Sequence, residues 1–220
     1  MIVSNVLNLI FAGLLIWLAC KYLDLKKKLH PANDRYYGLV NAISSIVDKY
    51  EGYDTAHAAE VRDIALKIAR KTPMNQQQLN SLETAALLHD VGMLLVSGDL
   101  LKSRRKFDEN EEYLIRTHTL LAEFYLKAEV AVTDDIPSII RWHHERWDGF
   151  GYPDGLKGTQ IPLASRIIAI ADSVSAMKHN RSYRKKHYSG IADIKLELQQ
   201  QSGLQFDPSL VKIFLEEFNE

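Results

Sequence analysis

The chain has 220 residues and a formal net charge of -1, with a single cysteine, Cys20. That length suits one domain of ordinary size. The near-neutral charge argues against a general nucleic-acid binder, so no DNA partner is expected. One cysteine excludes a disulfide framework and a zinc site built from several cysteines. Any metal ligands must therefore come from carboxylates and from the eight histidines.

The amino-terminal segment differs from the rest of the chain. Residues 2–20 contain no charged side chain, and Lys21 and Lys26–Lys28 follow directly. A helix of roughly 20 apolar residues spans a bilayer, and basic flanks stay on the cytoplasmic side. We therefore expect a single transmembrane anchor over residues 1–21 and a basic juxtamembrane connector over residues 22–33. Residues 34–220 would then form a domain at the cytoplasmic membrane, facing the cytoplasm.

Three other interpretations of this segment stay open. A cleaved signal peptide normally begins with a basic region, which is missing here. Leu18-Ala19-Cys20 faintly resembles a bacterial lipoprotein cleavage site. A buried or interfacial helix is the third alternative, because the apolar span is short and only moderately hydrophobic.

From residue 34 onward the pattern is helical almost throughout. Asp108 with Glu111 forms a capping-box-like helix start, Pro137 suits a first helical turn, and Asp207 precedes Pro208 in the same way. Residues 147–158 are rich in glycine and indicate an ordered loop. No run alternates with period two over strand length. The sequence therefore predicts an all-α bundle, with helices expected near residues 40–50, 55–72, 75–92, 108–128, 135–144, 162–177, 190–200 and 208–218.

Seven imidazole and carboxylate residues are distributed over at least five of these predicted helices, on or beside apolar stretches. A single histidine in such a place is more often a satisfied core residue than a ligand. Burying seven polar groups without partners would cost about 1–3 kcal/mol each, whereas metal ions would satisfy them together. The seven candidates are His57, His89, Asp90, His118, His143, His144 and Asp172.

Several motifs around these residues occur in a specific order. Residues 85–92 read AALLHDVG, and residues 143–153 read HHERWDGFGYP, continued by GLKG at 155–158 and IP at 161–162. Further motifs are ASRI at 164–167, AD at 171–172, RSYR at 181–184 and FDP at 206–208. With these motifs, residues 53–214 strongly resemble the HD-GYP family of bacterial cyclic dinucleotide phosphodiesterases.

The resemblance implies an HD-type helical bundle that holds two divalent transition-metal ions. Iron or manganese is expected, with nickel and zinc as alternatives. The ligands would be the seven residues named above, with Asp90 bridging both ions and with His89 and Asp90 as the catalytic pair. A hydroxide shared by the ions would open the 3′–5′ phosphodiester of cyclic di-GMP. Arg181 and Arg184 would bind substrate phosphate through their guanidinium groups, although a solvated basic patch is the alternative for these arginines.

Two positions depart from the family pattern. Met93 stands where the family usually has a lysine that contacts phosphate, and a thioether donates no hydrogen bond. Tyr53 stands where members with three metals have an extra carboxylate, which favours two ions over three. Glu145 and Asp148 are expected to brace the glycine-rich loop, and that loop is expected to close over the site.

The leading hypothesis is thus a membrane-anchored, metal-dependent phosphodiesterase for cyclic di-GMP or a related cyclic dinucleotide. Met93 motivates one alternative, a non-catalytic or weakly active receptor or interaction module for cyclic dinucleotides. An HD-type phosphohydrolase acting on another nucleotide is the second alternative. The sequence leaves open a homodimer and a signalling protein partner.

Overall fold

The computed structural model describes residues 35–53, 56–96, 98–101, 105–129, 135–179, 188 and 190–218. By their internal contacts, residues 1–40 and residues 41–220 form two compact units. The predicted anchor and connector, over residues 1–33, lie outside the described residues. Among the helices that are described, none combines the length and the apolar character needed to cross a bilayer.

The described residues form helices and loops, with no strand among them, so the all-α prediction is confirmed for this part of the chain. A helix over residues 35–50 comes first. The α-helices that follow are α2 (His57–Ala69), α3 (Gln76–Leu88), α4 (Gly98–Leu101), α5 (Glu109–Arg116), α6 (His118–Glu129), α7 (Asp135–Arg141), α8 (Leu163–Lys178), α9 (Ile191–Gln200) and α10 (Pro208–Glu217). Two short 3-10 helices are η1 (Val91–Leu95) and η2 (Gly158–Gln160).

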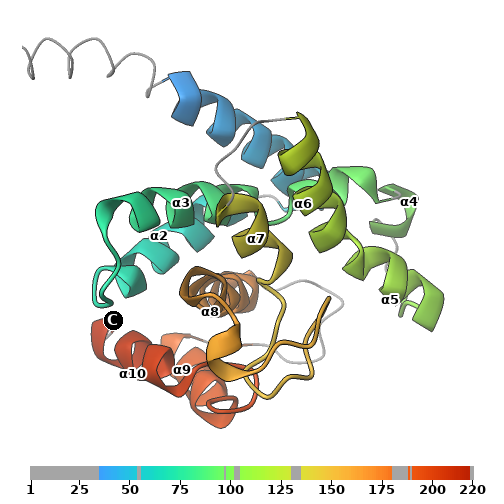
Figure 1. Cartoon of the computed structure of the whole chain (residues 1–220). Coiled ribbons are helices and arrows are strands. Elements are labelled where there is room, and N and C mark those ends of the chain that lie inside the picture. The colour runs from blue at the N-terminus through green and yellow to red at the C-terminus, as the bar shows by residue number, and fades with distance from the viewer. Residues whose placement is uncertain are drawn as a thin grey trace, which may run out of the picture. The chain divides into compact units, whose positions relative to one another are not determined.

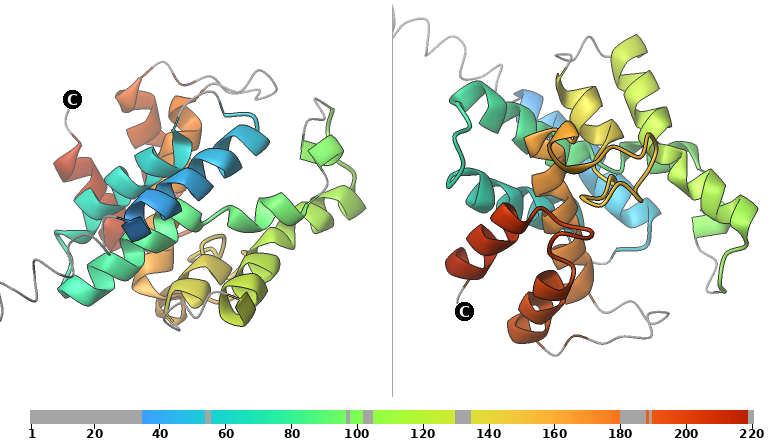
Figure 2. Two further views of the ribbon diagram at one scale, coloured as in Figure 1. Left: turned by 90° about the horizontal axis from the view of Figure 1, so that it is seen from above. Right: turned by 60° about the horizontal axis from the view of Figure 1, so that its bottom comes forward.

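Helix α8 is the central element of the unit formed by residues 41–220. It contacts α2, α3, α7, α9 and α10, and Figure 1 shows it end-on, with α2 and α3 on one side and α9 and α10 on the other. Ile167, Ile170 and Val174 are spaced at helical periodicity and have no exposed surface. By contrast, α5 contains no buried residue, and in both views of Figure 2 it lies with α4 at one edge of this unit.

The helix starts follow the predicted chemistry. The side chain of Asp108 accepts from the backbone N–H of Glu111, and the side chain of Glu111 accepts from Asp108 in return. Asp207 accepts from the backbone N–H of Ser209, with Pro208 in the first turn of α10. Each contact satisfies a backbone donor that has no partner within its own helix.

Three details differ from the predictions. The single helix expected near residues 108–128 is divided at Thr117, whose hydroxyl bonds the carbonyl of Leu114 and competes with the helical pattern. Helix α7 ends at Arg141, so His143 and His144 lie in the turn that follows it. The first helix already includes residue 35, ahead of the start expected near residue 40.

Candidate metal centre

The seven predicted ligands are brought together from five helices. His57 is the first residue of α2, His89 directly follows α3, and His118 is the first residue of α6. His143 and His144 follow α7, and Asp172 lies within α8. Most of the ligands are thus at helix ends, where backbone turns aim side chains from different helices at a common point.

The ligand atoms form two groups that share one carboxylate. One group contains His57, His89 and Asp90, and the other contains Asp90, His118, His143 and His144. Within each group the ligand atoms lie within 4.8 Å of one another. Asp172 joins the first group, because its Oδ1 lies 3.4 Å from Nε2 of His57 and 4.0 Å from Nε2 of His89.

Asp90 is placed to bridge the two groups through its two different oxygens. Its Oδ2 lies 2.9 Å from Nε2 of His89. Its Oδ1 lies 3.4 Å from Nε2 of His118 and 3.8 Å from Nε2 of His143. A carboxylate held in this way can offer one oxygen to each of two neighbouring cations.

The hydrogen bonds of the imidazoles define which nitrogen faces the centre. The Nδ1 atoms of His89, His118 and His143 lie 2.9, 2.8 and 2.6 Å from the carbonyl oxygen three residues earlier. Since a carbonyl only accepts, each Nδ1 carries the proton and donates it. When such a ring is neutral, its Nε2 carries the lone pair. In His57, His89, His118 and His143 this atom is buried and faces a carboxylate of Asp90 or Asp172.

This pattern fits a metal site. Four buried imidazole nitrogens thus face the same small volume, and burying such polar groups destabilises a fold unless they are satisfied. An imidazole that donates Nδ1–H to an acceptor and presents Nε2 inward is the usual form of a metal-bound histidine. Neutral imidazole and carboxylate together suit divalent transition metals. The ligand set therefore fits two divalent ions that share Asp90.

The charges of the ligands are coupled to one another. Burial lowers the pKa of His89, but the carboxylates of Asp90 and Asp172 outweigh this effect and raise it to about 10. Burial, together with the neighbouring His118, lowers the pKa of His144 to about 3. Burial raises the pKa of Asp90, yet the imidazole of His89 and its neighbours hold this pKa well below its usual range. Asp90 is therefore ionised and His144 neutral at pH 7.

The glycine-rich loop lies against the second group of ligands and is braced as predicted. Glu145 accepts the backbone N–H groups of Asp154 and Gly155 on Oε1 and of Leu156 on Oε2. Asp148 accepts from Arg146 and from the backbone N–H of residue 150. With the loop fixed in this way, the ring of Tyr152 lies 4.9 Å from that of His144 and 6.5 Å from that of His118.

Tyr53 occupies one side of His57. The two rings are stacked, with centroids 4.1 Å apart and planes inclined by 6°. An aromatic ring therefore lies at the position where family members with three metals have an extra carboxylate. Of the described residues, only the two groups that share Asp90 have the spacing for a metal ion.

Some residues of the site were not predicted from the sequence, and two predicted residues lie outside the described part of the chain. Arg181 and Arg184 fall on residues that the structure does not describe, so their role in substrate binding stays a prediction. Ser175 and Glu60 carried no recognisable motif, yet Ser175 bonds the ligand His57 and Glu60 bonds Ser175. Asp48 was also missed; it is buried and accepts the backbone N–H of Ala58 at the start of α2.

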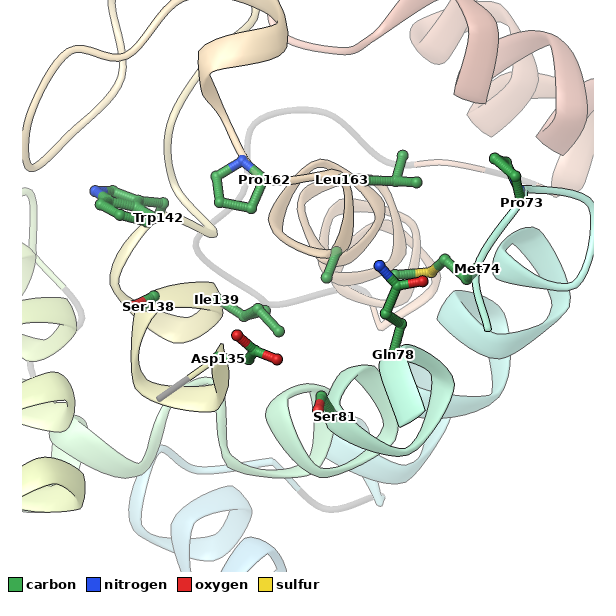
Figure 3. A pocket seen from close by; sticks show the side chains of 11 residues that line it. Pro73, Met74, Gln78, Ser81, Asp135, Ser138, Ile139, Trp142, Pro162 and Leu163 are labelled. Carbon is green, nitrogen blue, oxygen red and sulfur yellow. The ribbon is translucent and has the colours of Figure 1, made fainter. Parts of the chain in front are cut away.

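A separate cavity of about 450 Å³ lies between α3, α7 and the start of α8. Its lining includes Gln78 and Ser81 from α3, Asp135 and Ser138 from α7, and Pro162 (Figure 3). None of the seven ligands lines it, so it is distinct from the metal centre.

Comparison with known proteins places the chain in a family. The HD domain family matches residues 41–210. The chain is 31% identical over 188 residues to the 3′3′-cGAMP-specific phosphodiesterase 2 of Vibrio cholerae, an alignment that covers 84% of this chain and 34% of that protein. It is 30% identical over 184 residues to a cyclic di-GMP phosphodiesterase of Thermotoga maritima, covering 79% and 47% respectively. The chain thus spans about a third to a half of the length of these relatives.

The fold is also found in solved structures. The cyclic GMP-AMP specific phosphodiesterase V-cGAP3 of Vibrio cholerae superposes with a TM-score of 0.65 at 22% identity, over 81% of this chain and 47% of that one. Bd1817 of Bdellovibrio bacteriovorus superposes with a TM-score of 0.59 at 17% identity, over 73% and 51%. By its sequence match, its helical fold and its relatives, the chain belongs to the HD domain family, in the HD-GYP branch.

Proposed function

We propose that this protein is a metal-dependent phosphodiesterase that hydrolyses a cyclic dinucleotide, with cyclic di-GMP as the first substrate to test. The observation that carries the proposal is the convergence of seven ligands into two groups bridged by Asp90. The names of relatives in Vibrio cholerae and Thermotoga maritima support the substrate class. Two bound divalent ions would polarise a phosphoryl oxygen and lower the pKa of water, which is the chemistry that phosphodiester hydrolysis requires.

The residues of the chain prepare the site for this reaction. Asp90 fixes the relative position of the two halves of the centre, because its two oxygens face different histidines. The carbonyl acceptors hold His118 and His143 with Nε2 facing inward. Tyr152, on the loop braced by Glu145, packs against His144. Such fixed polar groups stabilise developing charge without reorganisation during the reaction.

Hydrolysis by the natural protein and by Asp90→Asn tests the proposal. With Mn²⁺ or, under anaerobic conditions, Fe²⁺, we expect the natural protein to convert cyclic di-GMP to a linear dinucleotide or to GMP. Removing the bridging charge should lower turnover by at least about 100-fold. Products are separated and quantified by chromatography. Asp63→Asn is the matched control, because the Asp63 side chain is 68% exposed and pairs with its sequence neighbour Arg62.

The outcome separates the proposal from its alternatives. Natural protein that carries metal but hydrolyses no faster than Asp90→Asn would contradict the enzymatic function. Binding of cyclic di-GMP without turnover would favour a receptor, for which Met93 is the motivating residue. A panel that includes 3′3′-cGAMP and other phosphorylated nucleotides identifies the substrate, and hydrolysis of a different nucleotide alone would favour the second alternative.

We also propose that the amino-terminal segment anchors the domain to the cytoplasmic membrane, with the domain in the cytoplasm. The uncharged residues 2–20 and the lysines that follow them support this. The full chain should remain with the membrane fraction after washes at high salt and alkaline pH. Its release into the soluble fraction by these washes would contradict a transmembrane anchor.

A further inference from the structure

His57 is oriented differently from the other described ligands of the centre. In His89, His118 and His143, Nδ1 bonds a backbone carbonyl three residues earlier. His57 is the first residue of α2, so no turn of the same helix precedes it. Its Nδ1 instead lies 2.9 Å from the hydroxyl Oγ of Ser175, which belongs to α8.

The direction of this hydrogen bond follows from the next contact. The hydroxyl of Ser175 lies 2.6 Å from Oε2 of Glu60, and an ionised carboxylate only accepts. Ser175 must therefore donate its single proton to Glu60 and accept from Nδ1–H of His57. Neutral His57 is therefore the tautomer with its proton on Nδ1 and its lone pair on Nε2. This Nε2 atom lies 3.4 Å from Oδ1 of Asp172 in the metal centre.

Glu60 is itself held in place by Lys178 and His179. Its Oε1 accepts from Nζ of Lys178 at 2.9 Å, and its Oε2 lies 2.8 Å from Nε2 of His179. Burial raises the pKa of Glu60, but hydrogen bonds from Ser175 and Lys178 outweigh burial and lower it. The contacts of Glu60 thus keep it ionised at neutral pH, and its charge acts on His57 through the hydroxyl of Ser175.

From this geometry we propose that Ser175 and Glu60 are positioning residues for the metal ion held by His57. This proposal rests on the proposed metal-dependent function. The chain from Glu60 through Ser175 to His57 fixes the imidazole and increases its basicity, as carboxylates do for metal-bound histidines. Because Ser175 bonds His57, which belongs to the group with His89 and Asp90, the ion held by that group is the one that depends on it directly.

Metal titration of Ser175→Ala tests the proposal. Protein stripped by a chelator is titrated with Mn²⁺, and the affinity of each of two sites is measured by the electron paramagnetic resonance signal of the free ion. We expect one site to weaken by about 10- to 100-fold, the range for loss of a hydrogen-bond partner of a ligand. The other site should stay within about 3-fold of its natural affinity. Glu60→Gln, which keeps an acceptor but loses the charge, should weaken the same site by a smaller factor.

Two matched controls separate positioning from general damage. Ser165→Ala removes another hydroxyl of α8 that has no exposed surface, but Ser165 donates to the carbonyl of Ile139 instead of to a candidate ligand. Glu123→Gln removes a carboxylate that likewise binds two cations, Lys127 and Arg141. Both controls should retain two sites of natural affinity. The thermal stability of each metal-free variant is measured in parallel.

The possible results distinguish the two proposals. If both sites of Ser175→Ala keep natural affinity, or if both weaken equally, the positioning role is wrong while the proposed function stands. If the natural protein binds no divalent ion, the metal-dependent function is wrong and the positioning role is wrong with it. A selective loss of one site in Ser175→Ala, absent from both controls, supports the role of Ser175 and Glu60.

Discussion

At the scale of single residues, identical side chains have opposite charge states because their neighbours differ. His89 lies 2.9 Å from a carboxylate oxygen of Asp90, and its pKa is raised to about 10. His144 lies beside other imidazoles and beneath Tyr152, and its pKa is lowered to about 3. In the metal-free protein at pH 7, His89 therefore carries a second proton and His144 does not. An ion that binds His89 must displace that proton.

Met93 is the residue on which the receptor alternative depends, and its environment is apolar. It is 8% exposed and packs with Val96 and Leu100, against which Phe107 and Ile115 also lie. The thioether thus fills part of a hydrophobic cluster.

We therefore expect Met93→Lys to weaken the fold without increasing turnover. Placing an ammonium group in this cluster should lower the free energy of unfolding by about 1–3 kcal/mol, because a buried polar group without a partner is unfavourable. Urea denaturation measures this change, and hydrolysis of cyclic di-GMP is assayed in parallel. Met93→Leu conserves volume and should lower stability by less than about 1.5 kcal/mol. Increased turnover in Met93→Lys with unchanged stability would show instead that Met93 limits catalysis.

At the scale of elements, close backbone approaches bring the helix ends together at the centre. Gly92, in η1, packs directly against the start of α6. A Cβ atom at this position would lie 2.0 Å from the carbonyl oxygen of His118 and 3.0 Å from the backbone nitrogen of Ala122. Glycine is therefore required here by space, since both neighbours are backbone atoms that cannot move independently.

Gly92→Ala should displace α6 and, with it, the ligand His118. We expect a loss of at least about 1–3 kcal/mol in unfolding free energy, the usual effect of overpacking, together with weaker metal binding. Urea denaturation and metal analysis measure the two effects. Gly38→Ala is the matched control: it lies in the helix over residues 35–50 with nothing within 4 Å of the added carbon. That control should stabilise the protein by up to about 1 kcal/mol. Equal stability of Gly92→Ala and natural protein would contradict this account.

The elements also show what the sequence could and could not predict. Capping at Asp108 and Asp207 was predictable because it depends on residues within one turn. The division at Thr117 was not, because a threonine hydroxyl bonding its own helix leaves no clear sequence signal. Ser175 is a similar case: its partners His57 and Glu60 are more than 110 positions away along the chain.

At the scale of the whole molecule, bound ions would connect five helices that the chain links only through loops. The ligands come from α2, α3, α6, α7 and α8 or from the turns beside them. An ion that binds the folded state and not the unfolded state stabilises the fold by mass action. The metal centre should therefore contribute to stability as well as to catalysis.

Metal removal should lower the melting temperature, and the difference should depend on pH. The raised pKa of His89 stabilises the metal-free fold fully below about pH 6.5, and this contribution is lost as the pH rises toward about 10. Over the same range, fewer protons compete with the ion, so the ion binds more tightly. The increase in melting temperature given by Mn²⁺ should thus grow between about pH 6 and about pH 8.5. Calorimetry of metal-loaded and chelator-treated protein measures it, and an increase that shrinks as the pH rises would contradict this coupling.

The sequence by itself predicted the helical class, the HD-GYP family and seven candidate metal ligands, because helix signals are local and the candidates occur in ordered motifs. Only the tertiary structure decided that Asp90 faces two groups of histidines with different oxygens. It also decided that Ser175 and Glu60 orient His57 and that Met93 packs in an apolar cluster. These features depend on distances between residues far apart in the chain, and such distances are set by the packing of helices against one another.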